Sequence, residues 1–326
     1  MNSGASPATV RFNALRAVFF FLDLFRKRPV SFVWLSVYHV AAYAAVALAS
    51  VAAVGLYGPE YADALVALEE DPGVASGVEM AAAEVRYSIA TTLASLASML
   101  VLLFVEAAWL RLMVRGEVRI APRWGDEGRV FLAGLVIGGL IGIAGLFGFV
   151  VNLFVIGIAA AAGGALAAAI VGVFVSAGLA GLLVWLGVRL SPLAALSLLR
   201  RRFAFGEAFA GTAGIFWPLM GAWFVATLAW CVLGAAAFLA VLSAPGPLGD
   251  AYLSGFRFDD PTAPLRAYAA ALESREALRL TAVAAVVMQL VQLPAVLAWR
   301  GIGARAALAI AARRDAAPVT EEASDA

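Results

Sequence analysis

The stretch Glu106–Phe131, EAAWLRLMVRGEVRIAPRWGDEGRVF, connects the end of one long apolar segment to the start of another through a densely charged turn. A second stretch, Arg189–Trp217, RLSPLAALSLLRRRFAFGEAFAGTAGIFW, repeats this plan. It has an arginine at a helix end, a short amphipathic segment, a glutamate, and aromatic residues that open the next apolar segment. We call the two stretches the first elbow and the second elbow. Charged turns between apolar segments are typical of membrane hairpins, so the elbows are the best candidates for a functional site.

The composition of the whole chain agrees with a membrane protein. Of the 326 residues, 63% are hydrophobic and 14% are charged, and the mean hydropathy is +0.93. A soluble domain of this length cannot bury so much apolar surface, so the excess is expected to face lipid. The formal net charge of +1 gives no indication that nucleic acid is a partner.

Six apolar segments are long enough to cross a membrane as helices. We therefore predict an all-α polytopic bundle of six transmembrane helices within residues 31–314, preceded by an amphipathic helix in residues 1–30 and followed by a disordered acidic tail, 315–326. The predicted spans are residues 31–56, 87–113, 130–156, 167–188, 215–242 and 278–299.

The amino-terminal helix is predicted from apolar residues that recur at every third or fourth position between Thr9 and Lys27, with charged residues among them. This pattern is typical of a helix that lies in the membrane interface. The alternative is a helix that packs against the cytoplasmic face of the protein itself.

Two longer stretches between the spans are expected outside the membrane. Residues 58–86 are acidic and only partly helical, with breaks expected at Pro59 and at Pro72-Gly73, and residues 243–276 begin with a Pro-Gly-Pro turn.

Small residues predict how two of the spans pack. Gly134, Gly138 and Gly142 form small-xxx-small steps, and Gly145 and Gly148 continue the small surface. Such steps allow close approach of helices in lipid. We expect their helix to lie centrally, and a short uncharged turn to return the chain as a tight antiparallel pair.

The basic residues predict the orientation. With six spans and a cytoplasmic amino terminus, all but five of the 23 Lys and Arg residues fall on the cytoplasmic side. The positive-inside rule therefore places both termini and both elbows in the cytoplasm, and the protein in the inner (plasma) membrane if it is bacterial. The five exceptions are Arg86, Arg257, Arg266, Arg275 and Arg279.

A few polar residues within the spans are candidates for a polar path. A carboxylate at the depth of Glu106 must be neutral, paired or in a wet cavity. Arg189, at the matching depth of the fourth span, is a better partner than Arg111, five residues away on the same helix. A structural ion pair and a proton or ion relay both remain open. The other candidates, which also suit packing or interhelical hydrogen bonds, are His39, Asn152, Gln289 and Gln292.

The elbows are rich in arginine, and the chain has 22 arginines and one lysine. Because the guanidinium group suits bidentate contact with phosphate, we predict a surface for anionic phospholipid headgroups, although orientation alone also places arginines here. Its residues are Arg115, Arg123, Arg129, Arg200, Arg201 and Arg202. The carboxylates beside them, Asp126, Glu127 and Glu207, are expected to cap helices and form salt bridges rather than act as acids, bases or metal ligands.

Several classes of function lack their motifs. The single cysteine, Cys231, excludes an intramolecular disulfide framework, and the single histidine, His39, excludes a metal site with two imidazoles. Glycine-rich phosphate loops, G-x-S-x-G and H-E-x-x-H do not occur. We therefore predict no enzymatic activity, no catalytic residue, no metal and no cofactor.

Both elbows resemble a group of uncharacterised bacterial six-span proteins that are similar to the membrane domain attached to some glycerophosphodiester phosphodiesterases. At the second elbow the resemblance rests on Arg189–Pro192, Arg201-Arg202, Phe205–Phe209 and Gly214–Trp217. At the first elbow it rests on Glu106, Arg111, Arg115–Glu117 and Gly125–Arg129. Ala213 stands where these proteins often have a basic residue, and the phosphodiesterase domain has no counterpart here. The resemblance implies a fold and no catalysis.

Three functional hypotheses follow. The leading one is a non-enzymatic protein of the cell envelope that binds membrane phospholipids, a partner protein or a second copy of itself through the elbows. The alternative is a transporter or channel subunit, and the third is a membrane-embedded lipid enzyme. The polar path of a transporter is expected near Glu106, His39, Asn152 and Gln289.

Overall fold

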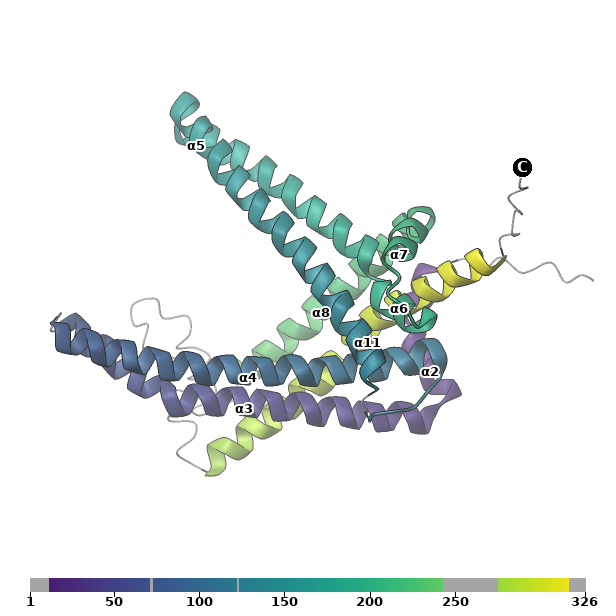
Figure 1. Ribbon diagram of the computed structural model, residues 1–326, viewed down its shortest axis with the longest axis horizontal. Helices are drawn as coiled ribbons and strands as arrows, with labels where there is room; N and C mark the ends of the chain where they lie inside the picture. The colour runs from purple at the N-terminus through teal and green to yellow at the C-terminus, as the bar shows by residue number, and fades with distance from the viewer. Residues whose placement is uncertain (1–11, 71–72, 122, 243–274, 317–326) are drawn as a thin grey trace, which may run out of the picture. The chain divides into compact units, whose positions relative to one another are not determined.

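The computed structural model describes residues 12–70, 73–121, 123–242 and 275–316 (Figure 1). All regular secondary structure in these ranges is helical, which confirms the all-α prediction. The helices are α1 (Ala14–Val18), α2 (Phe20–Lys27), α3 (Pro29–Glu70), α4 (Val74–Arg115), α5 (Trp124–Leu190), α6 (Leu193–Arg200), α7 (Phe205–Gly211), the 3-10 helix η1 (Ala213–Ile215), α8 (Phe216–Leu242) and α11 (Arg275–Ala316). The loop predicted after the fifth span lies almost entirely outside the described residues, as do nearly all of the predicted acidic tail and the first eleven residues.

The chain divides into two compact units. Unit 1 comprises Met1–Leu24, Ala107–Ala226 and Ala298–Ala326, and unit 2 comprises Phe25–Glu106 and Thr227–Leu297. Both elbows belong to unit 1, apart from Glu106.

In unit 2, α3 and α4 lie side by side along much of their length (Figure 1). The rings of Tyr61 and Tyr87 stack with their centroids 5.3 Å apart, and Arg86 forms an ion pair with Glu60. The break expected at Pro59 was wrong, because α3 continues through this residue. A proline inside a helix removes one backbone hydrogen bond, and the contacts of α3 with α4 beside Pro59 offset that loss.

In unit 1, α5 folds back on itself (Figure 1). Gly164 has φ 74° and ψ −170°, a combination that essentially only glycine adopts, and the chain reverses there. The amide of Asn152 donates to the Ser176 hydroxyl at 2.8 Å across the two arms, and Leu179 fills the space where a side chain on Gly148 would lie. The predicted tight antiparallel pair is therefore confirmed.

The arms of α5 meet at one end of the predicted small-residue surface. A Cβ atom added at Gly134, Gly138 or Gly142 would have no neighbour from another segment of the described chain within 4 Å. The predicted close approach is therefore confirmed at Gly148, while the three other glycines have no such neighbour within unit 1. The arms meet at Gly148 and Asn152. Because each residue turns a helix by about 100°, Asn152, 18 residues after Gly134, lies on the same face of the first arm as that glycine.

The amino-terminal helices α1 and α2 pack against α11 within unit 1. The Asn13 side chain caps α1 by accepting a hydrogen bond from the backbone N–H of Arg16 at 3.0 Å. Ala17 is fully buried, and a Cβ atom on Gly301 would lie 3.0 Å from its carbonyl oxygen. This contact favours the alternative prediction, in which the segment packs on the protein itself.

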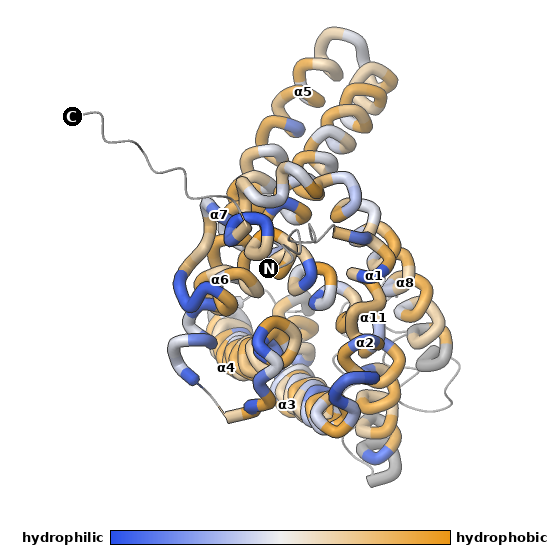
Figure 2. Tube along the Cα trace, turned by 90° about the vertical axis from the view of Figure 1, so that its right-hand side faces the viewer, coloured by the Kyte–Doolittle hydropathy of each residue, from blue (hydrophilic) through white to orange (hydrophobic). Residues whose placement is uncertain are grey.

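Five stretches of the described helices are long and apolar enough to cross a membrane. Large side chains along the arms of α5 are uncovered: Phe147 is 71% exposed and Phe174 is 74% exposed. Figure 2 shows hydrophobic residues along both arms and hydrophilic residues at α6 and α7. Apolar surface of this extent requires lipid, so the chain is a multi-pass membrane protein. The five stretches are Pro29–Leu68, Ser76–Arg115, Trp124–Arg200, Phe205–Ala237 and Ala282–Ala316.

Candidate functional site

A packed core within unit 1 holds the two elbows. The last turns of α4 are buried, α6 packs against α5 and α7, and the end of α11 is buried as well. The fully buried side chains include Trp109, Leu112, Leu193, Leu196, Leu198 and Ile302. The charged side chains of the elbows therefore extend from helix ends whose positions are fixed by close packing.

The first elbow begins where α4 ends. Gly116 has φ 69°, and its N–H donates to the Leu112 carbonyl at 3.1 Å, which is the usual way for a left-handed glycine to end a helix. The chain then turns towards the start of α5 at Trp124, where two carboxylates follow in the first helical turn. Negative charge is favourable at a helix amino terminus.

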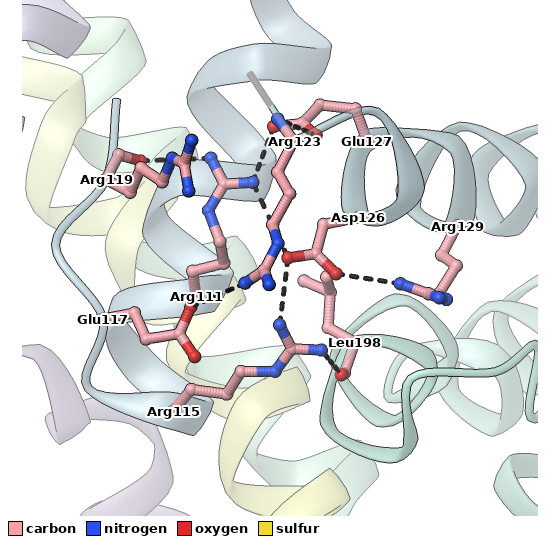
Figure 3. Close-up of polar contacts among 9 residues, drawn as sticks. All are labelled: Arg111, Arg115, Glu117, Arg119, Arg123, Asp126, Glu127, Arg129 and Leu198. Carbon is pink, nitrogen blue, oxygen red and sulfur yellow. Dashed lines mark hydrogen bonds and ion pairs between the residues drawn. The ribbon is translucent and has the colours of Figure 1, made fainter. Parts of the chain in front are cut away.

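Glu127 connects the two ends of the first elbow (Figure 3). One of its oxygens accepts from Nη1 of Arg111 at 2.6 Å, and the other accepts from the backbone N–H of Arg123 at 2.8 Å, before the first turn of α5. Nη2 of Arg111 donates to the Arg119 carbonyl at 3.1 Å. Arg111 and Glu127 have side chains that are 0% and 2% exposed, so this ion pair is excluded from water.

Asp126 is shared by two more arginines (Figure 3). Its two oxygens accept from Nη1 of Arg115 and from Nη1 of Arg129, each at 2.9 Å. Nη2 of Arg115 also donates to the carbonyl of Leu198 on α6. Asp126 therefore links the start of α5 to α4, and Arg115 links both to the second elbow.

We call Arg111, Arg115, Asp126, Glu127 and Arg129 the first-elbow network. The salt bridging predicted for the two carboxylates is confirmed. Arg115 and Arg129, which are predicted to contact lipid headgroups, donate to Asp126, and their side chains are 8% and 28% exposed. The central role of Arg111 was missed, because its partner is 16 residues away beyond a turn and no sequence periodicity relates the two.

The second elbow has a different arrangement around Glu207 on α7. Nε of Arg200 and Nη2 of Arg202 donate to it at 2.9 and 3.0 Å, and Nη1 of Arg314 lies 3.2 Å away. Glu207 is 4% exposed, and the salt bridging predicted for it is confirmed. Arg200 also contacts Asp315 near the end of α11 at 2.9 Å, so α6, α7 and α11 meet at these charges.

An open groove of about 430 Å³ lies between α7 and α11. Glu207, Arg313 and Arg314 supply its charged groups, and Ile310 supplies an apolar wall. The two helices approach closely here, as shown by Gly211, where an added Cβ atom would collide with Ile310. The groove is lined by Gly206, Glu207, Ala210, Gly211, Ile310, Arg313 and Arg314.

Two exposed arginines of this region, Arg201 and Arg313, make no ion pair with any residue that the structure describes. Nη1 of Arg313 lies over Gly214, 3.2 Å from where a Cβ atom would be. Arg201 ends α6 with φ 55° and ψ 24°, a left-handed conformation that glycine normally takes. We call Arg200, Arg201, Arg202, Arg313 and Arg314, with Glu207 and Asp315, the second-elbow cluster. It contains five arginines and two carboxylates, and two of the sequence-predicted arginines, Arg200 and Arg202, share Glu207.

The remaining predicted lipid-contacting residue, Arg123, lies at the edge of the first elbow. Its side chain is 49% exposed and 3.7 Å from Glu117. At that distance and exposure the pair is weak.

The polar residues predicted within the spans are divided between the units. In unit 2, His39 is fully buried and stacks on Tyr43 with the ring centroids 4.3 Å apart, while Gln289 and Gln292 are half-buried on α11. In unit 1, Asn152 connects the arms of α5. The polar path expected from these residues involves both units and stays a prediction.

Arg189, near the end of α5, contacts two aromatic rings. The carbon of its guanidinium group is 4.4 Å from the ring centroid of Phe209 and 5.5 Å from that of Trp185. Its Nη1 reaches the hydroxyl of Thr212 at 3.5 Å. The pairing predicted with Glu106 concerns residues of different units and stays a prediction.

No protein-family model matches the chain, and no curated protein or solved structure matches it either. The resemblance of the elbows to the phosphodiesterase-associated membrane domain therefore stays a prediction from the sequence, and the chain is identified only as a multi-pass membrane protein of helices.

Proposed function

We propose that this protein is a non-enzymatic, six-span protein of the inner membrane that binds the headgroup of an anionic phospholipid at its second elbow. The supporting observation is the excess of exposed arginines beside the groove between α7 and α11. Each step of the proposal has its own support and its own test.

The count of six spans rests on α5. This helix contains two arms that reverse at Gly164, and each arm is longer than the roughly 20 residues that a membrane span needs. With both arms as spans, the two elbows lie on the same side of the membrane, where the arginines favour the cytoplasm.

Cysteine accessibility tests this topology. In a Cys231→Ala background, an impermeant thiol reagent added outside spheroplasts is expected to label Ala162→Cys, next to the reversal of α5. It is expected to label Arg201→Cys only after the membrane is permeabilised. Labelling of both or neither from outside contradicts the six-span topology.

The lipid site rests on charge and shape. The second-elbow cluster has five arginines and only two carboxylates, so it carries an excess of positive charge. Three of the arginines contact the buried Glu207, and the other carboxylate, Asp315, is 61% exposed. A guanidinium group can contact a phosphate through two parallel hydrogen bonds, and Arg313 has its donors available at the rim. The wall formed by Ile310 can contact the glycerol or the first methylenes of a lipid. Juxtamembrane arginines are also attracted to the anionic cytoplasmic leaflet.

The backbone of Arg201 supports a role for its charge. A left-handed conformation costs a residue with a Cβ atom about 1–2 kcal/mol relative to glycine, and glycine is the usual residue at the end of a helix. Arg201 is exposed and has no ion pair among the described residues, so no contact within the described chain compensates for this cost. Contact with an anion outside the protein is a reason for an arginine here.

Native mass spectrometry with phosphatidylglycerol and phosphatidylcholine tests the lipid site. The variant Arg201→Gln/Arg313→Gln removes the two arginines without removing a partner of Glu207. Its affinity for phosphatidylglycerol is expected to fall about tenfold or more, as for loss of charged hydrogen bonds, and to become more similar to that for phosphatidylcholine. The control, Arg119→Gln/Arg279→Gln, removes the same charge at exposed positions outside the cluster and is expected to bind like the wild type. An equal loss of phosphatidylglycerol affinity in both variants would indicate a general electrostatic attraction between the protein and the lipid, and would contradict the proposed site.

A further inference from the structure

Arg189 differs from the other arginines of the elbows that lie in or next to a buried network. Arg111, Arg115 and Arg200 each contact a carboxylate within 3 Å. Among the described residues, no carboxylate lies within 4 Å of Arg189, so its positive charge is not neutralised by an ion pair there.

Aromatic rings hold this guanidinium group in place. It lies over Phe209 at 4.4 Å and near Trp185 at 5.5 Å, and the two rings pack edge to face with their centroids 5.8 Å apart. Cation–π contacts stabilise the position of the cation but leave its net charge in place. Any further polar contact of this side chain must be made by its N–H groups, because a guanidinium group has donors and no acceptor.

The hydrogen-bonding capacity of Arg189 is largely unused. A guanidinium group has five N–H donors. Nη1 makes one contact, with Thr212 at 3.5 Å, which is long for a hydrogen bond. Nε is buried and has no hydrogen-bond partner in the part of the chain that the structure describes. The side chain as a whole is only partly buried, so the terminal nitrogens remain open to an acceptor from outside the chain.

The position of Arg189 indicates which acceptor is available. It lies in the last turn of α5, at the end of an apolar arm whose side chains are exposed, and Trp185 beside it is 38% exposed. Tryptophan and arginine at helix ends mark the headgroup level of a membrane, and the negative group at that level is the lipid phosphate.

We propose that Arg189, held by Trp185 and Phe209, forms a second anion-binding site that takes a phosphate group through the unused N–H groups of its guanidinium. The site is separate from the groove, because α7 contributes Phe209 here and Glu207 there. A phospholipid headgroup and free phosphate share this chemistry, and the experiment distinguishes them.

The test is native mass spectrometry of the full-length protein after delipidation, with phosphatidylglycerol or inorganic phosphate as the probe. Arg189→Gln is expected to retain one phosphatidylglycerol fewer than the wild type, or to bind it at least about tenfold more weakly. Arg189→Lys keeps the charge but not the planar donor edge, so an intermediate loss is expected. If millimolar inorganic phosphate displaces the lipid from the wild type but not from Arg189→Gln, the site accepts free phosphate as well. If it displaces none, the lipid headgroup is the ligand.

A variant on the ring keeps the test decisive if Arg189→Gln does not fold. Phe209→Leu preserves the apolar packing but removes the cation–π contact, and is expected to weaken phosphatidylglycerol binding about threefold or more. Full retention of lipid in a folded Arg189→Gln, or in Phe209→Leu if the former is unfolded, overturns the proposal. The groove variant Arg201→Gln/Arg313→Gln leaves this site intact, so failure of the groove and failure of this site give different results.

Discussion

The first and second elbows each surround a buried carboxylate with arginines, but they differ in how far those arginines are exposed. In the first elbow the partner is buried too, since Arg111 and Glu127 are 0% and 2% exposed. In the second elbow Glu207 is 4% exposed, while Arg202 and Arg314 are each 61% exposed. A pair buried on both sides cannot exchange its partner without leaving a charge in a low-dielectric interior. An exposed arginine can exchange a carboxylate for another anion, because water solvates it meanwhile. The first elbow therefore fixes structure, and the second is available for binding.

The strongest test of this comparison removes one partner of the buried pair. Arg111→Gln leaves Glu127 without its guanidinium, and breaking a buried ion pair costs about 3–5 kcal/mol. The free energy of unfolding in mixed micelles, from denaturant titration, is expected to fall by that amount. The control Glu117→Gln removes the partially exposed carboxylate 3.7 Å from Arg123 and is expected to cost less than about 1 kcal/mol. Similar losses of unfolding free energy in both variants would show that the buried ion pair contributes no more to stability than an exposed one.

Replacing both partners sharpens the interpretation. Apolar residues of similar volume often substitute for a buried ion pair with little loss. The double variant Arg111→Met/Glu127→Leu is expected to lose less than about 2 kcal/mol, and so to be more stable than Arg111→Gln in the same titration. A double variant as unstable as the single one would mean that other bonds of these side chains, such as the one to the Arg119 carbonyl, dominate.

The corresponding change in the second elbow is expected to have a smaller effect on stability and a larger one on binding. Glu207→Gln releases exposed arginines into water, so the unfolding free energy is expected to fall by only about 1 kcal/mol. The released arginines raise the positive charge beside the groove, so phosphatidylglycerol is expected to bind more tightly by native mass spectrometry, with the gain reduced at high salt. Weaker binding would show that Glu207 orients the arginines for the ligand rather than competing with it.

The smallest expected effect concerns the backbone of Arg201. Arg201→Gly removes the Cβ atom from a left-handed position and is expected to stabilise the fold by up to about 1 kcal/mol, measured by thermal unfolding. Arg201→Gln loses the same charge but keeps the Cβ atom. Both variants are expected to bind phosphatidylglycerol equally weakly, and only Arg201→Gly to be more stable. Equal stability of the two would argue against strain at this position.

Much of the fold could be predicted from local sequence. Apolar length predicts where the long helices lie, because a span must satisfy its own backbone hydrogen bonds in lipid. The residue types at the start of α5 predict that Asp126 and Glu127 serve salt bridges, since carboxylates near arginines at a helix start are stabilised there. The reversal at Gly164 lies within the turn expected from the small uncharged residues around it.

Other features required the tertiary structure. Pro59 has the local character of a helix break, but contacts between α3 and α4 favour a continuous helix. The small-residue surface from Gly134 to Gly148 predicts a packing face, but only the tertiary structure shows that the second arm covers it at Gly148 and not at Gly134. The conformational preference of a single residue is weak, so the alternatives it favours or disfavours differ little in free energy. Contacts between helices then decide which alternative is adopted.

The sequence by itself determined that this is a membrane protein of helices with arginine-rich elbows, because composition and the lengths of apolar segments are local properties. Only the tertiary structure decided which arginines are buried and which are available. The partners of the elbows are 16 residues apart for Arg111 and Glu127, 83 for Arg115 and Leu198, and 115 for Arg200 and Asp315. Whether such side chains meet depends on how the helix ends pack, and burial then sets the strength of each charge through the local dielectric.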